Sequence, residues 1–529
     1  MIKQKIKRSI EKSIKELQKE KVFPEFEISG IKIEHPEEKT HGDYSTNIAM
    51  VLSKKIKKDP IEIAKILAPR LQVLGSGLFE KVKIAKPGFI NFFLAKEYLQ
   101  SQVKEIFKKG EKYGQLETGK KKKAQVEFIS ANPTGPLTVG NARGGPLGDA
   151  LANILNKVGF KAEKAYYIND YGMQILALGH SVLKNKEVKY KGKYIDYLHQ
   201  KIKEEDPYKA GEKAVKIILK EMIKKTTDKI GIDYNEWISE IELHKSGAVD
   251  EALKILDKKG LLYKKEGASW FKSSKFGDER DRVVVKSDGW KTYLAGDIAL
   301  HRYKFEKKKF DKVINIWGAD HAGDVAGLQA GVEALGHKGK LDIILLQFVT
   351  IIERGEKKKM SKRRGTFVTM DELLDKVGSD VTRFFFLQKS ADTHLNFDLS
   401  LAKEQSEKNP VYYIQYAHAR ICSILRKATS YKLQATSYKL LNHPSELNLI
   451  KQLIRFPEII EDTAEDYQVQ RIPQYAIDLA TVFHQFYRDC QVLTENRSLT
   501  LARLALILAT KIVLKNTLDL MGISAPEKM

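Results

Sequence analysis

The 529-residue sequence has only two cysteines and no long uncharged apolar run. Cys422 and Cys490 lie far apart without Cys-x-x-Cys spacing. This pattern excludes a cysteine-ligated zinc site and a disulfide framework, and it is typical of a reducing compartment. No stretch of about 18 uncharged apolar residues occurs, so we expect no membrane-spanning segment. Residues 1–20 form a basic amphipathic pattern rather than a signal peptide. We therefore expect a cytoplasmic protein.

Paired histidines are absent, and acidic residues are fewer than basic ones. The twelve histidines show no His-x-x-x-His spacing, so we expect no protein-bound metal site. The 92 Lys+Arg outnumber the 68 Asp+Glu and give a formal net charge of +24. Such an excess indicates a polyanion partner, with nucleic acid first, although a merely solvated surface is the alternative. The length allows three or four domains.

Residues 124–158 combine a predicted strand, a glycine-rich loop and a helix. The run from Val126 to Ile129 is β-prone and stops at Asn132-Pro133. Five of the fourteen residues from Gly135 to Gly148 are glycine, and apolar residues recur at helical spacing from Leu147 to Val158. This order lets backbone N–H groups and a helix N-terminus meet phosphate oxygens, with glycine allowing close approach. An ordinary strand-to-helix turn is the alternative, and no Walker Gly-Lys-Ser/Thr follows.

Other apolar runs predict the rest of a sheet. A strand and turn are expected in Ala165–Ile175. One buried strand is expected in Val313–Trp317, and one more in Leu341–Ile352. Continuous rather than alternating hydrophobicity favours a parallel sheet covered on both faces. Ligands of such sheets bind at the carboxyl ends of the strands.

The segment Lys357–Gly365, KKKMSKRRG, has six basic residues among its first eight. A surface charge run would be the plain interpretation. However, KMSKR together with SANPTGPLTVGNARGGPLGD in residues 130–149 resembles the two signatures of class I aminoacyl-tRNA synthetases, in the form of the arginyl-tRNA synthetase family. The two stand in the family's order, about two hundred residues apart. The family's first signature ends in two histidines, and this chain has Thr138 and Asn141 in those places.

The resemblance covers nearly the whole chain and implies an α/β fold. We expect a class I Rossmann-type parallel sheet in a catalytic domain at 120–400, with an insertion at about 182–290. An N-terminal α+β domain that contacts tRNA is expected at 1–115, in which His41–Tyr44 resembles a capped helix start. An all-α anticodon-binding domain is expected at 401–529.

The implied activity is ATP-dependent attachment of L-arginine to tRNA(Arg) through an arginyl-adenylate, with Mg²⁺ carried by ATP, by a monomer. Because both histidines are absent, a catalytically inactive tRNA-binding paralogue is an alternative. The intact KMSKR, Tyr293 and Asp297 argue against it, because an inactive site would be expected to lose these residues too. A nucleotidyltransferase of the same superfamily is a second alternative. The basic charge and the helical C-terminal third argue against it.

The resemblance assigns residues to the reaction. Five signature residues are expected to be catalytic: Lys359, Ser361, Lys362, Thr138 and Asn141. The lysines would neutralise charge that shifts onto the departing pyrophosphate. The residues expected to bind ATP are Pro133, Gly135, Thr138, Gly140, Asn141, Gly318, Asp320, His321, Met360 and Lys362.

The resemblance also implies which residues bind arginine and which bind tRNA. A guanidinium presents a planar fork of donors that a carboxylate meets best, and Asp297 with Tyr293 matches the family's side-chain clamp. For Asp297 alone, a helix-start carboxylate is the alternative. The expected arginine-binding residues are Glu127, Ser130, Asn132, Asn141, Tyr293, Asp297 and His321. The expected tRNA-binding residues are Lys120, Lys121, Lys122, Lys123, Tyr412, Gln415 and Tyr416.

Overall fold

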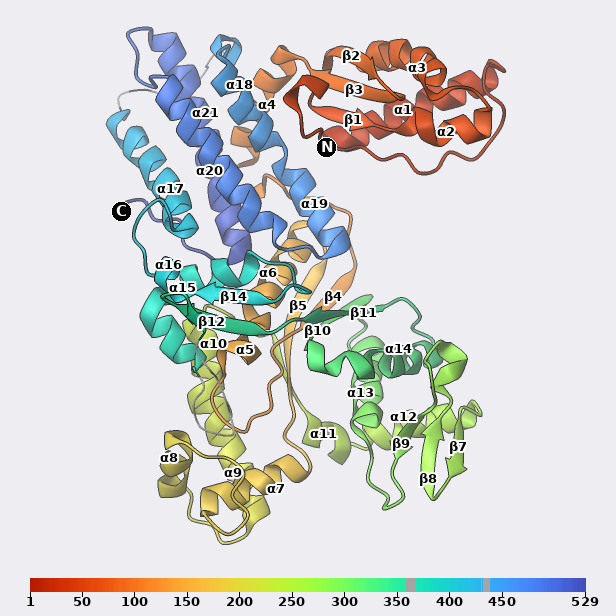
Figure 1. Cartoon of the computed structure of the whole chain (residues 1–529), viewed down its shortest axis with the longest axis vertical. Helices are drawn as coiled ribbons and strands as arrows, with labels where there is room; N and C mark the ends of the chain where they lie inside the picture. The colour runs from red at the N-terminus through yellow and green to blue at the C-terminus, as the bar shows by residue number, and fades with distance from the viewer. Residues whose placement is uncertain (358–367, 430, 432–437) are drawn as a thin grey trace.

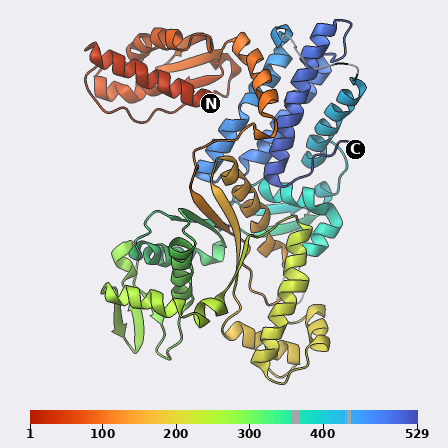
Figure 2. The same cartoon turned by 180° about the vertical axis from the view of Figure 1, so that it is seen from behind.

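The structure is a computed structural model that describes residues 1–357, 368–429, 431 and 438–529. A central sheet occupies the middle of the molecule (Figures 1 and 2). A helical bundle and the N-terminal domain lie at one end, and two separate lobes lie at the other. The predicted catalytic residues Lys359, Ser361 and Lys362, and Met360 beside them, lie outside the described residues.

The N-terminal domain packs helices on a three-stranded antiparallel sheet of order β1-β3-β2. Its helix α1 buries isoleucines at a spacing of four residues, as an amphipathic helix does. The elements are α1 (Ile2–Lys19), β1 (Tyr44–Thr46), α2 (Ile48–Ile56), α3 (Pro60–Leu74), β2 (Phe79–Ala85) and β3 (Phe89–Leu94). Helix α4 (Lys96–Lys109) follows and packs in the helical bundle (Figure 1).

The helix start predicted at His41–Tyr44 is wrong. Tyr44 begins strand β1, and the Asp43 carboxylate accepts a hydrogen bond from the Leu94 backbone N–H of β3 at 2.8 Å. The aspartate therefore caps a strand pair rather than a helix.

The central sheet has five strands, all parallel, in the order β11-β10-β4-β5-β6. This confirms the parallel sheet that the apolar runs predict. Its strands are β4 (Lys123–Glu127), β5 (Lys161–Ile168), β6 (Glu236–Ser239), β10 (Lys312–Gly318) and β11 (Leu341–Leu346).

The apolar run Leu341–Ile352 is two strands rather than one. After β11 the chain leaves the central sheet, and β12 (Val349–Glu353) pairs with β14 (Leu395–Asp398) and β13 (Glu356–Lys357). The break falls at Gln347, whose N–H bonds Ala391 O at 2.9 Å and whose carbonyl accepts from the buried Arg143 guanidinium at 2.5 Å. Two polar backbone contacts thus redirect a continuously apolar segment.

The glycine-rich stretch is mostly helix. Helices α5 (Val139–Ala142) and α6 (Gly144–Lys157) begin before the predicted helix start at Leu147. A Cβ at Gly148 would lie 2.2 Å from Phe128 Cγ, and one at Gly145 would lie 2.7 Å from Ile232 Cδ1. These glycines therefore let α6 approach its neighbours closely, and they do not face a ligand.

The two lobes arise from different parts of the chain between strands of the sheet. One contains α7 (Met173–Leu183), α8 (Lys193–Lys201), α9 (Pro207–Ile218), η3 (Leu219–Ile223) and α10 (Lys224–Lys229). The other contains α11 (Glu240–Lys245), α12 (Ala248–Lys258), β7 (Leu262–Lys265), β8 (Ala268–Phe271), β9 (Arg282–Val285), α13 (Tyr293–Arg302), η5 (Tyr303–Lys307) and α14 (Val325–Ala334). Strand β6, inside the range 182–290, belongs to the central sheet. That range is therefore not a single insertion outside the sheet.

The described C-terminal part is helical, as predicted. Its helices are α17 (Pro410–Lys427), α18 (Pro444–Ile454), α19 (Phe456–Asp466), α20 (Arg471–Asp489) and α21 (Arg497–Met521), and helices α15 (Met370–Leu387) and α16 (Leu399–Ala402) precede them. Among the described residues, no helix is both long and apolar enough to cross a membrane.

Candidate active site

The chain turns sharply where β4 ends. Ile129 and Ser130 have φ values of 66° and 38°, a left-handed conformation that β-branched residues rarely adopt and that concentrates at functional sites. The Ser130 hydroxyl donates to Glu127 Oε1 at 3.3 Å and accepts from Tyr167 N–H of β5 at 3.0 Å. The predicted residues Glu127 and Ser130 thus meet at the carboxyl edge of the sheet.

The two residues in the histidine positions contact each other. Thr138 is the N-cap of α5: its hydroxyl donates to Asn141 Oδ1 at 2.6 Å and accepts from the Asn141 N–H at 3.2 Å. Between them, Gly140 is open, because a Cβ there would come no closer than 4.0 Å to Thr138 Oγ1. Gly140 is therefore an exposed position in this short helix with no close neighbour.

A cavity of about 620 Å³ lies beside this signature segment. Asn132, Gly135 and Asn141 line it together with Tyr190, from the connection before α8, and Tyr194, the second residue of α8. The Tyr194 hydroxyl donates to Thr134 O at 3.0 Å, so the neighbouring lobe braces the loop. The structure brings these predicted residues into one space.

A second cavity, of about 610 Å³, is lined by Tyr293 of the predicted clamp but not by Asp297. Tyr293, 68 % exposed, lines it at the first residue of α13, and Asp297 follows one turn later within the helix. Asp297 is thus mid-helix, which excludes the helix-start alternative. Glu240, at the first residue of α11, lines the same cavity, and a Cβ at Gly296 would lie 3.8 Å from its Oε1.

Glu240 is a functional candidate that the sequence does not indicate. It is 4 % exposed, and its Oε2 has no hydrogen-bond partner among the described residues. Asp170 positions it, because the Asp170 carboxylate accepts from the Ile241 N–H at 2.9 Å and from the Ser239 hydroxyl at 2.7 Å. Only the unforeseen strand β6 places this residue at the site, and no local sequence pattern could have found it.

Burial and nearby negative charges raise the pKa values of two carboxyls at this site. Burial, and then the charge of Asp297, raise the pKa of Glu240 to about 8. Burial, and then the charge of Glu127, raise the pKa of Asp297 to about 7. Two neighbouring carboxyls that resist ionisation are stabilised in their charged form by a cation between them. A guanidinium, with its fork of donors, suits the pair.

Several predicted residues lie elsewhere or are already engaged. Asp320 and His321 follow Gly318 at the end of β10, and both side chains are more than half exposed. Gln415 donates to Asp380 at 2.8 Å and to Ser524 O at 3.1 Å. The tyrosines Tyr412 and Tyr416 stack on α17 with ring centroids 6.4 Å apart.

The predicted tRNA lysines lie at the other end of β4. Lys120, Lys121 and Lys122 are exposed just before this strand, and Lys123 is its first residue. They are therefore at the amino edge of the sheet, opposite the two cavities at its carboxyl edge.

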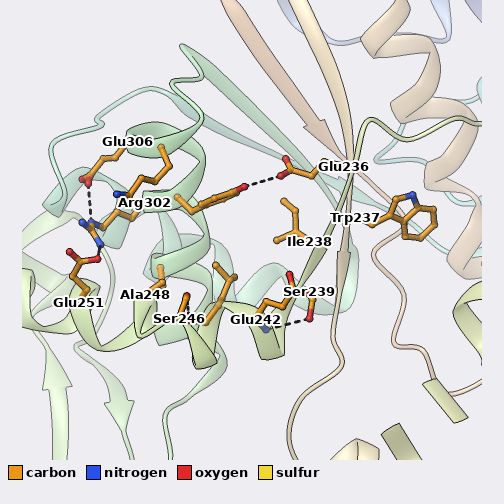
Figure 3. Close-up of a pocket in the computed structure, with 14 residues that line it drawn as sticks. Glu236, Trp237, Ile238, Ser239, Glu242, Ser246, Ala248, Glu251, Arg302 and Glu306 are labelled. Carbon is orange, nitrogen blue, oxygen red and sulfur yellow. Dashed lines mark hydrogen bonds and ion pairs between the residues drawn. The ribbon is translucent and has the colours of Figure 1, made fainter. Parts of the chain in front are cut away.

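A third cavity, of about 510 Å³, lies between β6 and the helices α11, α12 and α13 (Figure 3). Arg302 pairs with Glu251 at 2.7 Å and with Glu306 at 2.9 Å, and Glu236 accepts from the Tyr303 hydroxyl at 2.9 Å. Its charges are largely satisfied by one another, and it contains none of the predicted residues that the structure describes. Within the described ranges, no group of three or more His, Cys, Asp or Glu could hold a metal ion.

Comparison with known proteins assigns the class. The family description "tRNA synthetases class I (R), catalytic domain" matches residues 102–205 and 182–392. "Arginyl tRNA synthetase N terminal domain" matches 4–94, and "DALR anticodon binding domain" matches 414–529. The chain thus has the three parts of a class I aminoacyl-tRNA synthetase.

Individual relatives make the assignment particular. An arginine--tRNA ligase of Caldanaerobacter subterraneus is 43 % identical over 100 % of this chain and 99 % of its own length. One of Bacillus subtilis is 42 % identical over 96 % and 95 %. The structure of Thermus thermophilus arginyl-tRNA synthetase has the same fold, with a TM-score of 0.78 at 23 % identity, and covers 99 % of this chain and 100 % of that one. The chain belongs to the arginyl-tRNA synthetase family.

Proposed function

We propose that the protein activates L-arginine with ATP and transfers the arginyl group to tRNA(Arg), acting as a monomer and releasing AMP and pyrophosphate. The observation that carries this proposal is the pair of carboxyls Asp297 and Glu240 near Tyr293 at the carboxyl edge of a parallel sheet, where Glu240 and Tyr293 line a cavity. In a chain with a net charge of +24, a buried carboxyl pair is a local site that attracts a small cation.

For arginine, Asp297 and Glu240 accept the guanidinium donors while Tyr293 covers the side chain. The α-amino and carboxylate groups lie toward the end of β4, where Ser130, Asn132 and Asn141 offer polar atoms. His321, exposed on the loop after β10, reaches the same substrate from the other side. Glu127 lies behind these residues and acts on Asp297 through its charge.

For ATP, the open face at Gly140 accepts the adenine, and Pro133, Gly135, Gly318 and Asp320 border the nucleotide. The arginine carboxylate attacks the α-phosphorus, and pyrophosphate departs with its Mg²⁺. Lys359 and Lys362 neutralise the departing charge, with Ser361 and Met360 shaping their loop. Thr138 and Asn141 take the positions of the family's histidines: both can donate hydrogen bonds, but neither can become cationic. Catalysis is by position and charge rather than by covalent steps.

For tRNA, Lys120–Lys123 and the stacked pair Tyr412 and Tyr416 provide a basic and an aromatic contact. Gln415 supports the end of α17 through its bonds to Asp380 and Ser524, besides any contact with RNA.

The decisive experiment measures arginine-dependent ATP consumption with and without tRNA. We expect AMP to accumulate with arginine and tRNA present and not with lysine in place of arginine. Charging of tRNA is measured in the same reaction with labelled arginine. A protein that binds tRNA but consumes no ATP under any of these conditions would be the inactive paralogue.

A further inference from the structure

A buried lysine lies behind the arginine pocket. Lys304 is 0 % exposed, and its Nζ lies 2.5 Å from Glu127 Oε2 and 3.4 Å from Asn315 Oδ1. Glu127, at the end of β4, is itself only 4 % exposed. A charge buried in this way is retained only beside a counter-ion and hydrogen-bond partners. Lys304 and Glu127 therefore form a closed charge pair inside the protein.

The local helix geometry explains this placement. Helix α13 ends at Arg302 and continues as the π-helix η5, whose second residue is Lys304. Single π turns widen a helix and concentrate at functional sites. Here the π turn brings Lys304 against β4 and β10, the strands of Glu127 and Asn315, just after the helix that holds Tyr293 and Asp297.

Hydrogen bonds connect this ion pair to the clamp. The Asn315 amide nitrogen lies 2.9 Å from His301 Nε2, and His301 Nδ1 lies 2.7 Å from the backbone oxygen of Asp297. Burial, and then the charge of Lys304, lower the pKa of His301 to about 3, so the imidazole is neutral and carries one proton. Because a carbonyl oxygen can only accept, that proton is on Nδ1 and Nε2 accepts from Asn315. A continuous chain thus runs from Glu127 to Asp297.

The charges around the pocket would be unbalanced without Lys304. Glu127 and Asp324 raise the pKa of Asp297, whereas Lys304 lowers it. The charges of Asp297 and Asp170 raise the pKa of Glu240 on α11. Lys304 is the cation that acts on Asp297 among these described groups.

We propose that Lys304 is a positioning residue for the arginine pocket: its buried charge neutralises Glu127, so that Asp297 supplies the negative charge that the substrate guanidinium meets. Lys304 has no exposed surface and does not touch the substrate. The inference rests on the proposed function, because it takes arginine as the ligand of this pocket.

Three variants test it: Lys304→Met, which removes the charge at similar length, Glu127→Gln, and the double variant. The measurement is the pH dependence of the KM for arginine between pH 6 and 9, beside the KM for ATP and tRNA. We expect Lys304→Met to move the midpoint of this dependence upward by about one pH unit, and so to raise the arginine KM about tenfold near neutral pH. Glu127→Gln should move the midpoint downward, and the double variant should return it close to that of the unchanged protein. The KM values for ATP and tRNA should change less than about twofold.

If Lys304 had only a structural role, Lys304→Met and Glu127→Gln would not move the midpoint in opposite directions. If Lys304→Met raises the arginine KM but leaves the midpoint in place, the inference is wrong. If Lys304→Met fails to fold, as its thermal unfolding would show, the double variant decides, because it buries neither charge. A double-variant midpoint displaced by a full unit then overturns the inference. If the unchanged protein does not use arginine at all, the proposed function fails. If it charges tRNA with arginine but the variants have the same pH midpoint as the unchanged protein, only this inference fails.

Discussion

At the scale of single residues, the pocket depends on the negative charge of Asp297. Asp297→Asn keeps the shape but turns one oxygen into an NH₂ donor that faces a donor. Removing one partner of a buried pair costs about 3–5 kcal/mol, which corresponds to a hundredfold to several thousandfold loss in arginine use. Glu240 ionises more readily once Asp297 is neutral, because the charge of Asp297 raises its pKa. We therefore expect a loss toward the lower end, measured as kcat/KM for arginine.

The matched control for this variant is Glu242→Gln, which removes an exposed carboxylate two residues from Glu240. Arginine use by the control, and tRNA binding by both variants, should match the unchanged protein. Unchanged arginine kinetics in Asp297→Asn would refute the clamp and the choice of arginine.

The same carboxyls predict that arginine binding depends on pH. Their pKa values are about 7 for Asp297 and about 8 for Glu240, above the ordinary range. The folded protein therefore binds extra protons, and its stability without arginine should fall as pH rises from about 4 to 8. Arginine favours the ionised forms, so binding should release protons near pH 7, and the KM should fall from pH 6 to 8. Calorimetry in two buffers of different ionisation enthalpy measures the release. An equal heat in both buffers would contradict the prediction.

At the scale of the elements, the sequence predicts the sheet better than the site. Strands β4 and β10 and the helical C-terminal part follow from apolar runs and spacing, because buried faces leave a periodic record. The break at Gln347 does not, because it depends on Arg143, some two hundred residues away in the sequence. Glu240 is hidden for the same reason: only the pairing of β6 with β5 brings it to the pocket. Tertiary contacts of this kind leave no local pattern.

The glycines of the first signature should separate into two kinds. Gly148→Ala puts a Cβ 2.2 Å from the buried Phe128 ring, and overpacking of this kind costs about 1–3 kcal/mol. Gly140→Ala meets open space, so its stability should be unchanged while the KM for ATP rises, if adenine lies there. Thermal unfolding and ATP kinetics on both variants check this. An ATP defect in neither variant would remove the nucleotide from Gly140.

At the scale of the whole molecule, ion pairs and hydrogen bonds connect the domains. Arg383 on α15 pairs with Asp149 on α6 and donates to Met521 O at the end of α21 at 2.6 Å. Glu458 on α19 accepts from the Tyr44 hydroxyl of the N-terminal domain at 3.1 Å, and Lys451 on α18 pairs with Asp43 at 2.6 Å. These contacts place the N-terminal domain and the helical bundle in fixed positions relative to the catalytic sheet. One large partner can therefore contact all three at once.

The last prediction concerns that partner and the net charge of +24. If lysines of several domains contact phosphates, tRNA binding releases counterions, and log K falls linearly with log salt by about 0.7–0.9 for each contact. We expect the tRNA affinity to fall at least about tenfold between 50 and 200 mM salt. The KM for arginine should hardly change, because buried pairs are screened little. Replacing the exposed Lys120, Lys121 and Lys122 by glutamine should reduce the slope by about 2–3 if all three contact phosphates. A flat dependence in the unchanged protein would mean that the excess charge only solvates the surface, and an unchanged slope in the triple variant would place the contacts elsewhere.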